Sequence, residues 1–306
     1  MSPAARRWLH VTGVLAAVAL LVTFARSIDW HAASDAMRAA DPLLLVAATL
    51  CNLVSLAAKG VRWWVLLRPL GVRSPMLVLR ATFAGASLNN LLVAQGGEGA
   101  RVLFVSRATG VSSARVLAAL TLERALDGVS YLVLLGGGAW LLVLPPDLAR
   151  WRPLASGVLA GALVTLLIFG FGTRGVRRGP SRLGPADPPA FMRRFVRAFI
   201  ELGSTRLIAL ALLLSLVAWA LQVATYHLVA RAVHLRLPLA GSVAALLSVG
   251  ISFLVRATPG NVGVFQTVYA LTVRSFGVAE SSAVAAALLI QIVQVVPTVL
   301  IGSLAT

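Results

Sequence analysis

The stretch LAALTLERALDGVSYLVLLGGGAWLLVL, residues 117–144, decides the fold class, because it joins charged side chains to a membrane-length apolar segment. The 17 residues from Gly128 to Leu144 carry no charge and would form a helix of ~26 Å at ~1.5 Å per residue. A bilayer core is ~30 Å thick, so we expect Glu123, Arg124 and Asp127 at or just inside its cytoplasmic edge. Unpaired charges at that depth are costly, so three together indicate a polar cavity. A structural cluster whose charges cancel is the alternative.

The composition of the whole chain agrees with a membrane protein. Hydrophobic residues make up 59%, charged residues 12%, and the mean hydropathy is +0.90, whereas a soluble domain carries ~25% charge. This predicts an all-α, polytopic membrane helix bundle of about seven or eight transmembrane helices, and it excludes a disordered chain, a fibrous repeat and a disulfide scaffold. The other expected spans are residues 8–25, 42–58 (with an extension to 67), 154–172, 207–230, 239–255 and 283–304.

We expect a single transmembrane domain over residues 1–306, made of two halves. The halves cover about 8–172 and 207–304, and a basic linker at 173–206 joins them. Part of this linker can form a basic amphipathic helix on the inner leaflet, although a plain topogenic loop fits as well.

Loop charges predict the orientation. The segments 59–115 and 174–206 each carry eight Lys or Arg residues, whereas the loops expected on the other side carry two each. Basic loops stay in the cytoplasm, so the N-terminus is expected there, in a bacterial cytoplasmic (inner) membrane. The net charge of +17 then indicates anionic inner-leaflet lipids as partners, and no nucleic acid. The first span could instead be a cleaved signal peptide.

Two glycine-rich breaks interrupt apolar segments, one in each half. They read LVAQGGEG at residues 92–99 and LVRATPGNVG at residues 254–263. Lipid cannot satisfy freed backbone groups, so such breaks must line protein or water. We therefore expect two re-entrant segments, which paired in this way favour an inverted-repeat transporter with its site between the halves. Two ordinary glycine-rich turns are the alternative.

Polar residues at these breaks complete the candidate substrate-binding site. A helix that restarts after the first break would carry Glu98 in its first turn and Arg101 on the same face, where free N–H groups and the guanidinium could bind an anion. Arg256 has no carboxylate within four residues, and its geometry suits a phosphate. A local Glu98–Arg101 pair and snorkelling of Arg256 are the alternatives. The candidate residues are Asn89, Glu98, Arg101, Glu123, Arg124, Asp127, Arg256, Pro259, Gly260 and Gln266.

Several catalytic signatures are missing from the sequence. The single lysine, Lys59, precedes Gly60, so no Walker A loop exists, and neither G-x-S-x-G nor H-E-x-x-H occurs. The four histidines have no metal-ligand spacing, so we expect no metal and no cofactor. The sequence therefore predicts no enzyme. An intramembrane enzyme that uses Glu123 and Asp127 as acid and base stays open.

Four motifs together resemble one family, the lysylphosphatidylglycerol synthase transmembrane region, also called the flippase-like domain family. They are Lys59-x-x-Arg62-Trp63-x-x-Leu66-Leu67, Asn89-Asn90-Leu91-Leu92 followed by Gly97-Glu98-x-x-Arg101, Glu123-Arg124-x-x-Asp127, and Pro259-Gly260-x-x-Gly263. Their order and spacing cover roughly residues 10–304. Two departures stand out: Ala94 and Gln95 occupy positions where the family often has proline, and Gln266 replaces a frequent glutamate.

The resemblance implies a bundle of about eight helices with re-entrant segments that moves lipids between leaflets. Members translocate aminoacylated phosphatidylglycerol, and others are tied to polyprenyl-phosphate-linked sugars. Some members continue into an aminoacyl-transferase domain, and this sequence, ending at Thr306, resembles the membrane part alone. Our hypothesis is a flippase or scramblase in which Arg101, Arg124 and Arg256 hold the lipid phosphate. An intramembrane enzyme, or an accessory subunit that serves a separate lipid-modifying enzyme or glycosyltransferase, is the alternative.

Overall fold

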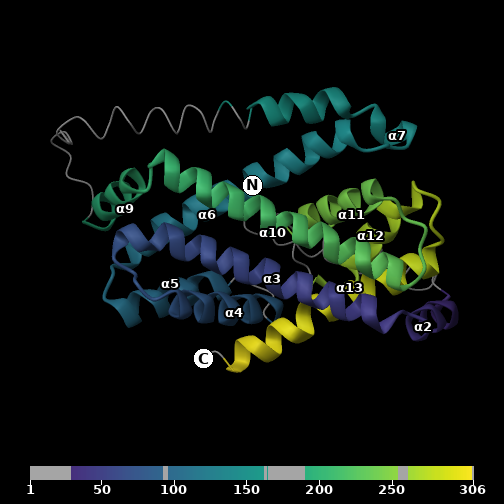
Figure 1. Ribbon diagram of the computed structural model, residues 1–306, viewed down its shortest axis with the longest axis horizontal. Helices are drawn as coiled ribbons and strands as arrows, with labels where there is room; N and C mark the ends of the chain where they lie inside the picture. Colours follow the sequence, from purple (N-terminus) through teal and green to yellow (C-terminus); the bar gives the residue numbers. More distant parts are fainter. Residues whose placement is uncertain (1–28, 92–95, 162–163, 165–189, 254–260, 305–306) are drawn as a thin grey trace, which may run out of the picture.

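The computed structural model describes residues 29–91, 96–161, 164, 190–253 and 261–304 (Figure 1). Every regular element in these residues is a helix, which confirms the predicted all-α membrane bundle. The helices are α2 (Trp30–Arg38), α3 (Pro42–Leu67), the 3-10 helix η1 (Arg68–Leu70), α4 (Pro75–Leu91), α5 (Gly96–Thr109), α6 (Ser113–Leu141), α7 (Pro146–Ala149), α9 (Ala190–Glu201), α10 (Thr205–Ala232), α11 (Leu239–Ser252), α12 (Val264–Arg274) and α13 (Glu280–Leu304). Residues 152–161 are also helical.

Three helices of the described residues are long and apolar enough to cross a membrane. They are α3 with η1, α10 and α13. Helix α6 has a comparable length of 29 residues, but it carries the charges of the opening stretch. The expected span at 239–255 is shorter in the structure, because α11 has only 14 residues, or ~21 Å. The predicted span at 8–25 lies outside the described residues.

Helices α3 and α10 run side by side through the middle of the molecule (Figure 1). Their contacts pair early residues of one with late residues of the other, so the two helices are antiparallel. Ser55 Oγ donates to the carbonyl of Ala218 at 2.8 Å, and Thr225 Oγ1 donates to the carbonyl of Ala48 at 3.4 Å. Small residues and hydroxyl hydrogen bonds let membrane helices approach closely, so this seam joins the two halves.

Each half contains a pair of short helices around a break. Helix α4 packs on α5 in the first half, and α11 packs on α12 in the second. Helix α13 of the second half packs on α4, and α6 of the first half packs on α11. The order and the pairing of the helices therefore correspond in the two halves. The inverted repeat stays a prediction, which this correspondence favours.

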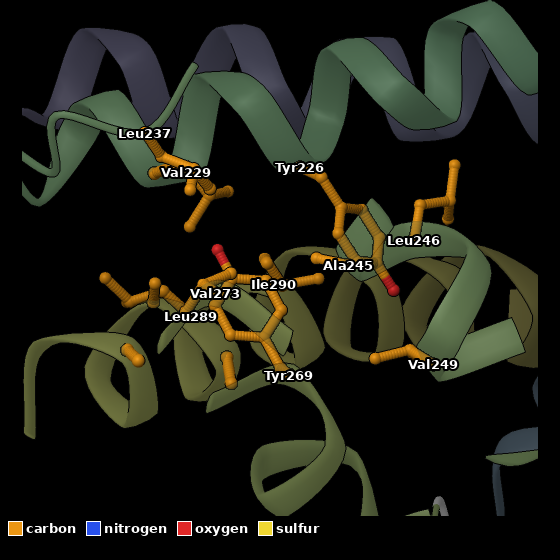
Figure 2. Packing of buried hydrophobic residues seen from close by; sticks show 14 of the residues in the cluster. Tyr226, Val229, Leu237, Ala245, Leu246, Val249, Tyr269, Val273, Leu289 and Ile290 are labelled. Atoms are coloured by element: carbon orange, nitrogen blue, oxygen red, sulfur yellow. The ribbon is translucent and has the colours of Figure 1, made fainter. Parts of the chain in front are cut away.

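The buried apolar side chains form two clusters. One lies among α10, α11, α12 and α13, where Tyr226, Leu246, Tyr269 and Ile290 converge (Figure 2). The other gathers residues of α3, α4, α5, α6 and α9 around the fully buried Trp63. The first cluster thus lies mainly in the second half and the second cluster mainly in the first half.

The first break is closed by an amide and two glycines. Asn89 Oδ1 accepts the backbone N–H of Gly97 at 3.0 Å, which caps the start of α5. A Cβ on Gly97 would lie against the backbone carbonyl of Gly85 and within 2.7 Å of Asn89 Oδ1. Only glycine permits this approach, and it brings α5 close enough for Arg101 to reach the helices beyond.

We expect Gly97→Ala to lower the free energy of unfolding by about 1–3 kcal/mol, because the methyl group would overlap a backbone carbonyl that cannot move aside. Gly99→Ala is the matched control on the same helix, since nothing lies within 4 Å of its Cβ position. Thermal unfolding of both variants in detergent micelles, followed by circular dichroism, measures the difference. Equal stability of the two variants would contradict the close crossing.

Candidate functional site

A buried arginine lies between two carboxylates at the centre of the first half. Arg62 Nη1 donates to Asp127 Oδ1 at 2.6 Å, and Nη2 donates to Glu123 Oε1 at 2.9 Å and to Asp127 Oδ2 at 3.1 Å. The Arg62 side chain is 0% exposed and that of Glu123 is 2% exposed. Ser215 of α10 accepts a further bond from Arg62 Nη1 at 2.6 Å. This arginine therefore links α3, α6 and α10.

Three more charged side chains form ion pairs that continue from Glu123 and from Asp127. Arg101 Nη2 donates to Glu123 Oε2 at 3.2 Å, and its guanidinium carbon lies 4.1 Å from the ring centroid of Trp63. Arg124 pairs with Glu98 and, at 3.6 Å, with Asp127. We call these six residues the charge network: Arg62, Glu98, Arg101, Glu123, Arg124 and Asp127. The positive charges of its three arginines equal the negative charges of its three carboxylates, so the network has no net charge.

Helical spacing explains why the carboxylates meet one arginine. Glu123 and Asp127 are one turn apart on α6, so both face α3 at Arg62. Each carboxylate accepts bonds from guanidinium groups, and such ionised, oriented pairs suit a positioning role better than general acid–base chemistry. The arrangement thus favours a structural cluster whose charges cancel over an intramembrane enzyme that uses Glu123 and Asp127 as acid and base.

The structure brings together five of the predicted site residues, namely Glu98, Arg101, Glu123, Arg124 and Asp127. The alternative of a local Glu98–Arg101 pair is wrong, because α5 packs on α6 and each residue finds its partner there. Asn89 lies next to the network as the cap of α5. The predicted residues Arg256, Pro259 and Gly260 lie outside the described residues.

Gln266 lies apart from the charge network, at the start of α12. Its Oε1 accepts the backbone N–H of Gly263 at 2.6 Å, and its Nε2 donates to Gln291 Oε1. A glutamate at this position could accept the first bond but could not donate the second while ionised. Gln266 therefore both caps α12 and links it to α13.

Sequence reasoning missed Arg62 and Lys59 as site residues. Neither was predicted to be a site residue, although each is a charge within the long apolar helix α3. A charge in such a helix requires a partner, and that requirement is the signal that could have singled them out.

A polar cavity of about 250 Å³ lies beside the charge network, between α3, α4, α10, α11 and α13. Gln294 Nε2 donates to Gln222 Oε1 at 2.8 Å, and Gln222 Nε2 donates to Asn52 Oδ1 at 3.1 Å. These amides form one wall, and Lys59, Asn90 and Trp219 also line the space. Both halves of the chain contribute side chains, so we call it the interhalf cavity.

We expect Arg62→Met to lower the free energy of unfolding by about 3–5 kcal/mol, because it leaves two buried carboxylates without their main partner. Arg115→Met removes an arginine of α6 whose bond to Glu201, 2.7 Å long, is largely exposed, and it should cost less than about 1 kcal/mol. Chemical unfolding of both variants in micelles compares them. If Arg62→Met were as stable as its control, the network would not hold these helices.

Comparisons with known proteins identify the family. A family model described as the lysylphosphatidylglycerol synthase TM region matches residues 10–302. A UPF0104 membrane protein of Methanothermobacter thermautotrophicus is 26% identical over 169 residues, which are 53% of this chain and 47% of that protein. The chain thus matches about half the length of this relative. Because the family model covers nearly the whole chain and the predicted motifs occur in order, the protein belongs to the lysylphosphatidylglycerol synthase transmembrane region family.

Proposed function

We propose that this protein is a lipid flippase or scramblase that moves lipids with phosphate-containing headgroups between the leaflets of the cytoplasmic membrane. The observation that carries the proposal is the interhalf cavity, a polar space between apolar helices to which both halves contribute. A headgroup that crosses a bilayer needs polar partners along its path, whereas the acyl chains remain in lipid. A cavity between two corresponding halves provides such partners where transporters commonly bind their substrates.

The charge network begins one turn of α3 away from Lys59, which lines the cavity, and it offers one half-exposed arginine. The Arg124 side chain is 48% exposed, whereas those of Arg62 and Arg101 are 0% and 6% exposed. Arg124 is therefore the arginine that can exchange its carboxylate partners for a lipid phosphate. Glu98 would then be free to bind a cationic group of the headgroup, whereas Asp127 keeps its bonds to Arg62.

The family name supports a substrate class. It refers to lysylphosphatidylglycerol, whose headgroup combines a phosphate with cationic amines. A site with equal numbers of arginines and carboxylates suits such a headgroup, and a polyprenyl-phosphate lipid would use the arginines alone. The enzyme that makes or consumes the lipid is then a separate partner.

The orientation in the membrane is part of the proposal. Helix α9 is amphipathic, with Arg193, Arg194 and Arg197 opposite an apolar face that packs on α6. Such a helix binds anionic headgroups of the inner leaflet, which supports a cytoplasmic position for α9. Together with the loop charges, this supports a cytoplasmic N-terminus.

We expect Arg124→Ala to slow lipid translocation by about tenfold or more, the effect of losing a charge-assisted bond of about 1.5 kcal/mol. Purified protein is reconstituted in vesicles that contain a trace of fluorescent-headgroup phosphatidylglycerol or of a polyprenyl phosphate analogue. A membrane-impermeant reductant then bleaches the accessible leaflet. Arg115→Ala is the control, because it removes an arginine of the same helix that lies outside the charge network.

The wild-type protein should expose more than half of the fluorescence to the reductant, and Arg115→Ala should match it. Normal translocation by folded Arg124→Ala would remove that arginine from the mechanism. Mass spectrometry of the same vesicles tests the enzyme alternative, because translocation leaves the lipid mass unchanged. A new lipid mass that depends on the protein would replace translocation by catalysis.

A further inference from the structure

Lys59, the single lysine of the sequence, lies within the long apolar helix α3 and lines the interhalf cavity. Each arginine of the charge network is paired, as the distances above show. Lys59 lies one helical turn before Arg62 on α3, yet it makes no salt bridge with any described residue. Its ammonium group lies 5.8 Å from the ring centroid of Trp219 and lines the interhalf cavity.

The amides around Lys59 leave hydrogen-bonding capacity directed at the same space. Gln222 and Asn52 use their amide groups within the wall, through the bonds described above and a bond from Asn52 Nδ2 to the carbonyl of Val293. Among the described residues, Gln294 Oε1 and the side-chain amide of Asn90 have no hydrogen-bond partner. The cavity therefore combines one positive charge with unused donors and an unused acceptor.

An apolar groove of about 210 Å³ lies next to the cavity, between α6 and α11. Tyr131 lines the groove and Trp219 lines the cavity, and their rings meet edge to face with centroids 5.7 Å apart. Tyr131 Oη also donates to the carbonyl of Leu247 at 2.6 Å, which fixes the ring beside α11. A charged polar site and an apolar groove thus lie on opposite sides of one aromatic pair.

We infer that the interhalf cavity binds the phosphate of an anionic glycerophospholipid, with Lys59 as the counter-charge and the groove beside Tyr131 as a surface for an acyl chain. This inference rests on the proposed function and names the binding position of its substrate. An unpaired ammonium within membrane helices is stabilised by an anion, and a phosphate diester supplies one charge. Asn90 and Gln294 bind the hydroxyl groups of the headgroup that is esterified to the phosphate. The adjoining groove favours a lipid over free phosphate.

Binding to the purified full-length chain in detergent tests the site without any transport step. Native mass spectrometry measures the apparent Kd for phosphatidylglycerol and for phosphatidylcholine with the same acyl chains. We expect Lys59→Met to weaken phosphatidylglycerol binding by about tenfold and to abolish the preference over phosphatidylcholine. Lys59→Arg should retain binding, and Arg115→Met, which removes a positive charge elsewhere, should leave it unchanged.

A second variant tests the same site in case Lys59→Met does not fold. Asn90→Asp adds a negative charge to the cavity wall and should weaken phosphatidylglycerol binding without removing any described hydrogen bond. Unchanged phosphatidylglycerol affinity in folded Lys59→Met would overturn the inference. Displacement of phosphatidylglycerol by equimolar inorganic phosphate would assign the cavity to a free anion and overturn the lipid assignment.

The vesicle assay separates this inference from the proposed function. Binding that depends on Lys59, with no translocation by the wild-type protein, would support the site and overturn the transport proposal. Translocation of phosphatidylglycerol by the wild-type protein at a rate that Lys59→Met leaves unchanged would support transport and overturn the site.

Discussion

The buried guanidinium of Arg62 is the interaction on which the arrangement of helices depends. It joins α3 to two carboxylates of α6 and to a hydroxyl of α10, with no exposure of its own side chain. A buried ion pair adds little net stability, but the loss of one partner leaves an uncompensated charge and is strongly unfavourable. The helices of the first half are therefore fixed in one register, and the antiparallel seam of α3 and α10 extends this constraint to the second half.

The charge network has no net charge, and its role differs from that of the neighbouring interhalf cavity. Its three arginines are matched by three carboxylates, so it orients the helices that carry them. Lys59, one turn away on the same helix, faces the interhalf cavity without a carboxylate among the described residues. Charge that is already paired holds the fold, and in our inference Lys59 is the charge that binds an anionic ligand. Arg124 lies between these cases, because it is both paired and half exposed.

The two breaks obey the same membrane constraint. A helix that starts within the bilayer has free N–H groups that lipid cannot satisfy. At α5 the amide oxygen of Asn89 accepts the N–H of Gly97, and at α12 the amide oxygen of Gln266 accepts the N–H of Gly263. In each half, one side-chain amide therefore satisfies one backbone N–H group near the start of the short helix.

The sequence by itself determined the membrane class, the extent of α3, α10 and α13, the first broken segment and the family. These follow from apolar run lengths, from glycine-rich interruptions and from ordered motifs, all of which are local. It also showed that Glu123 and Asp127 share one helix face. Only the tertiary structure decided the partners, such as Arg62 for both carboxylates and Arg124 for Glu98. Helical periodicity determines which residues share a face of a helix. The packing of whole helices determines which side chains of other helices contact that face.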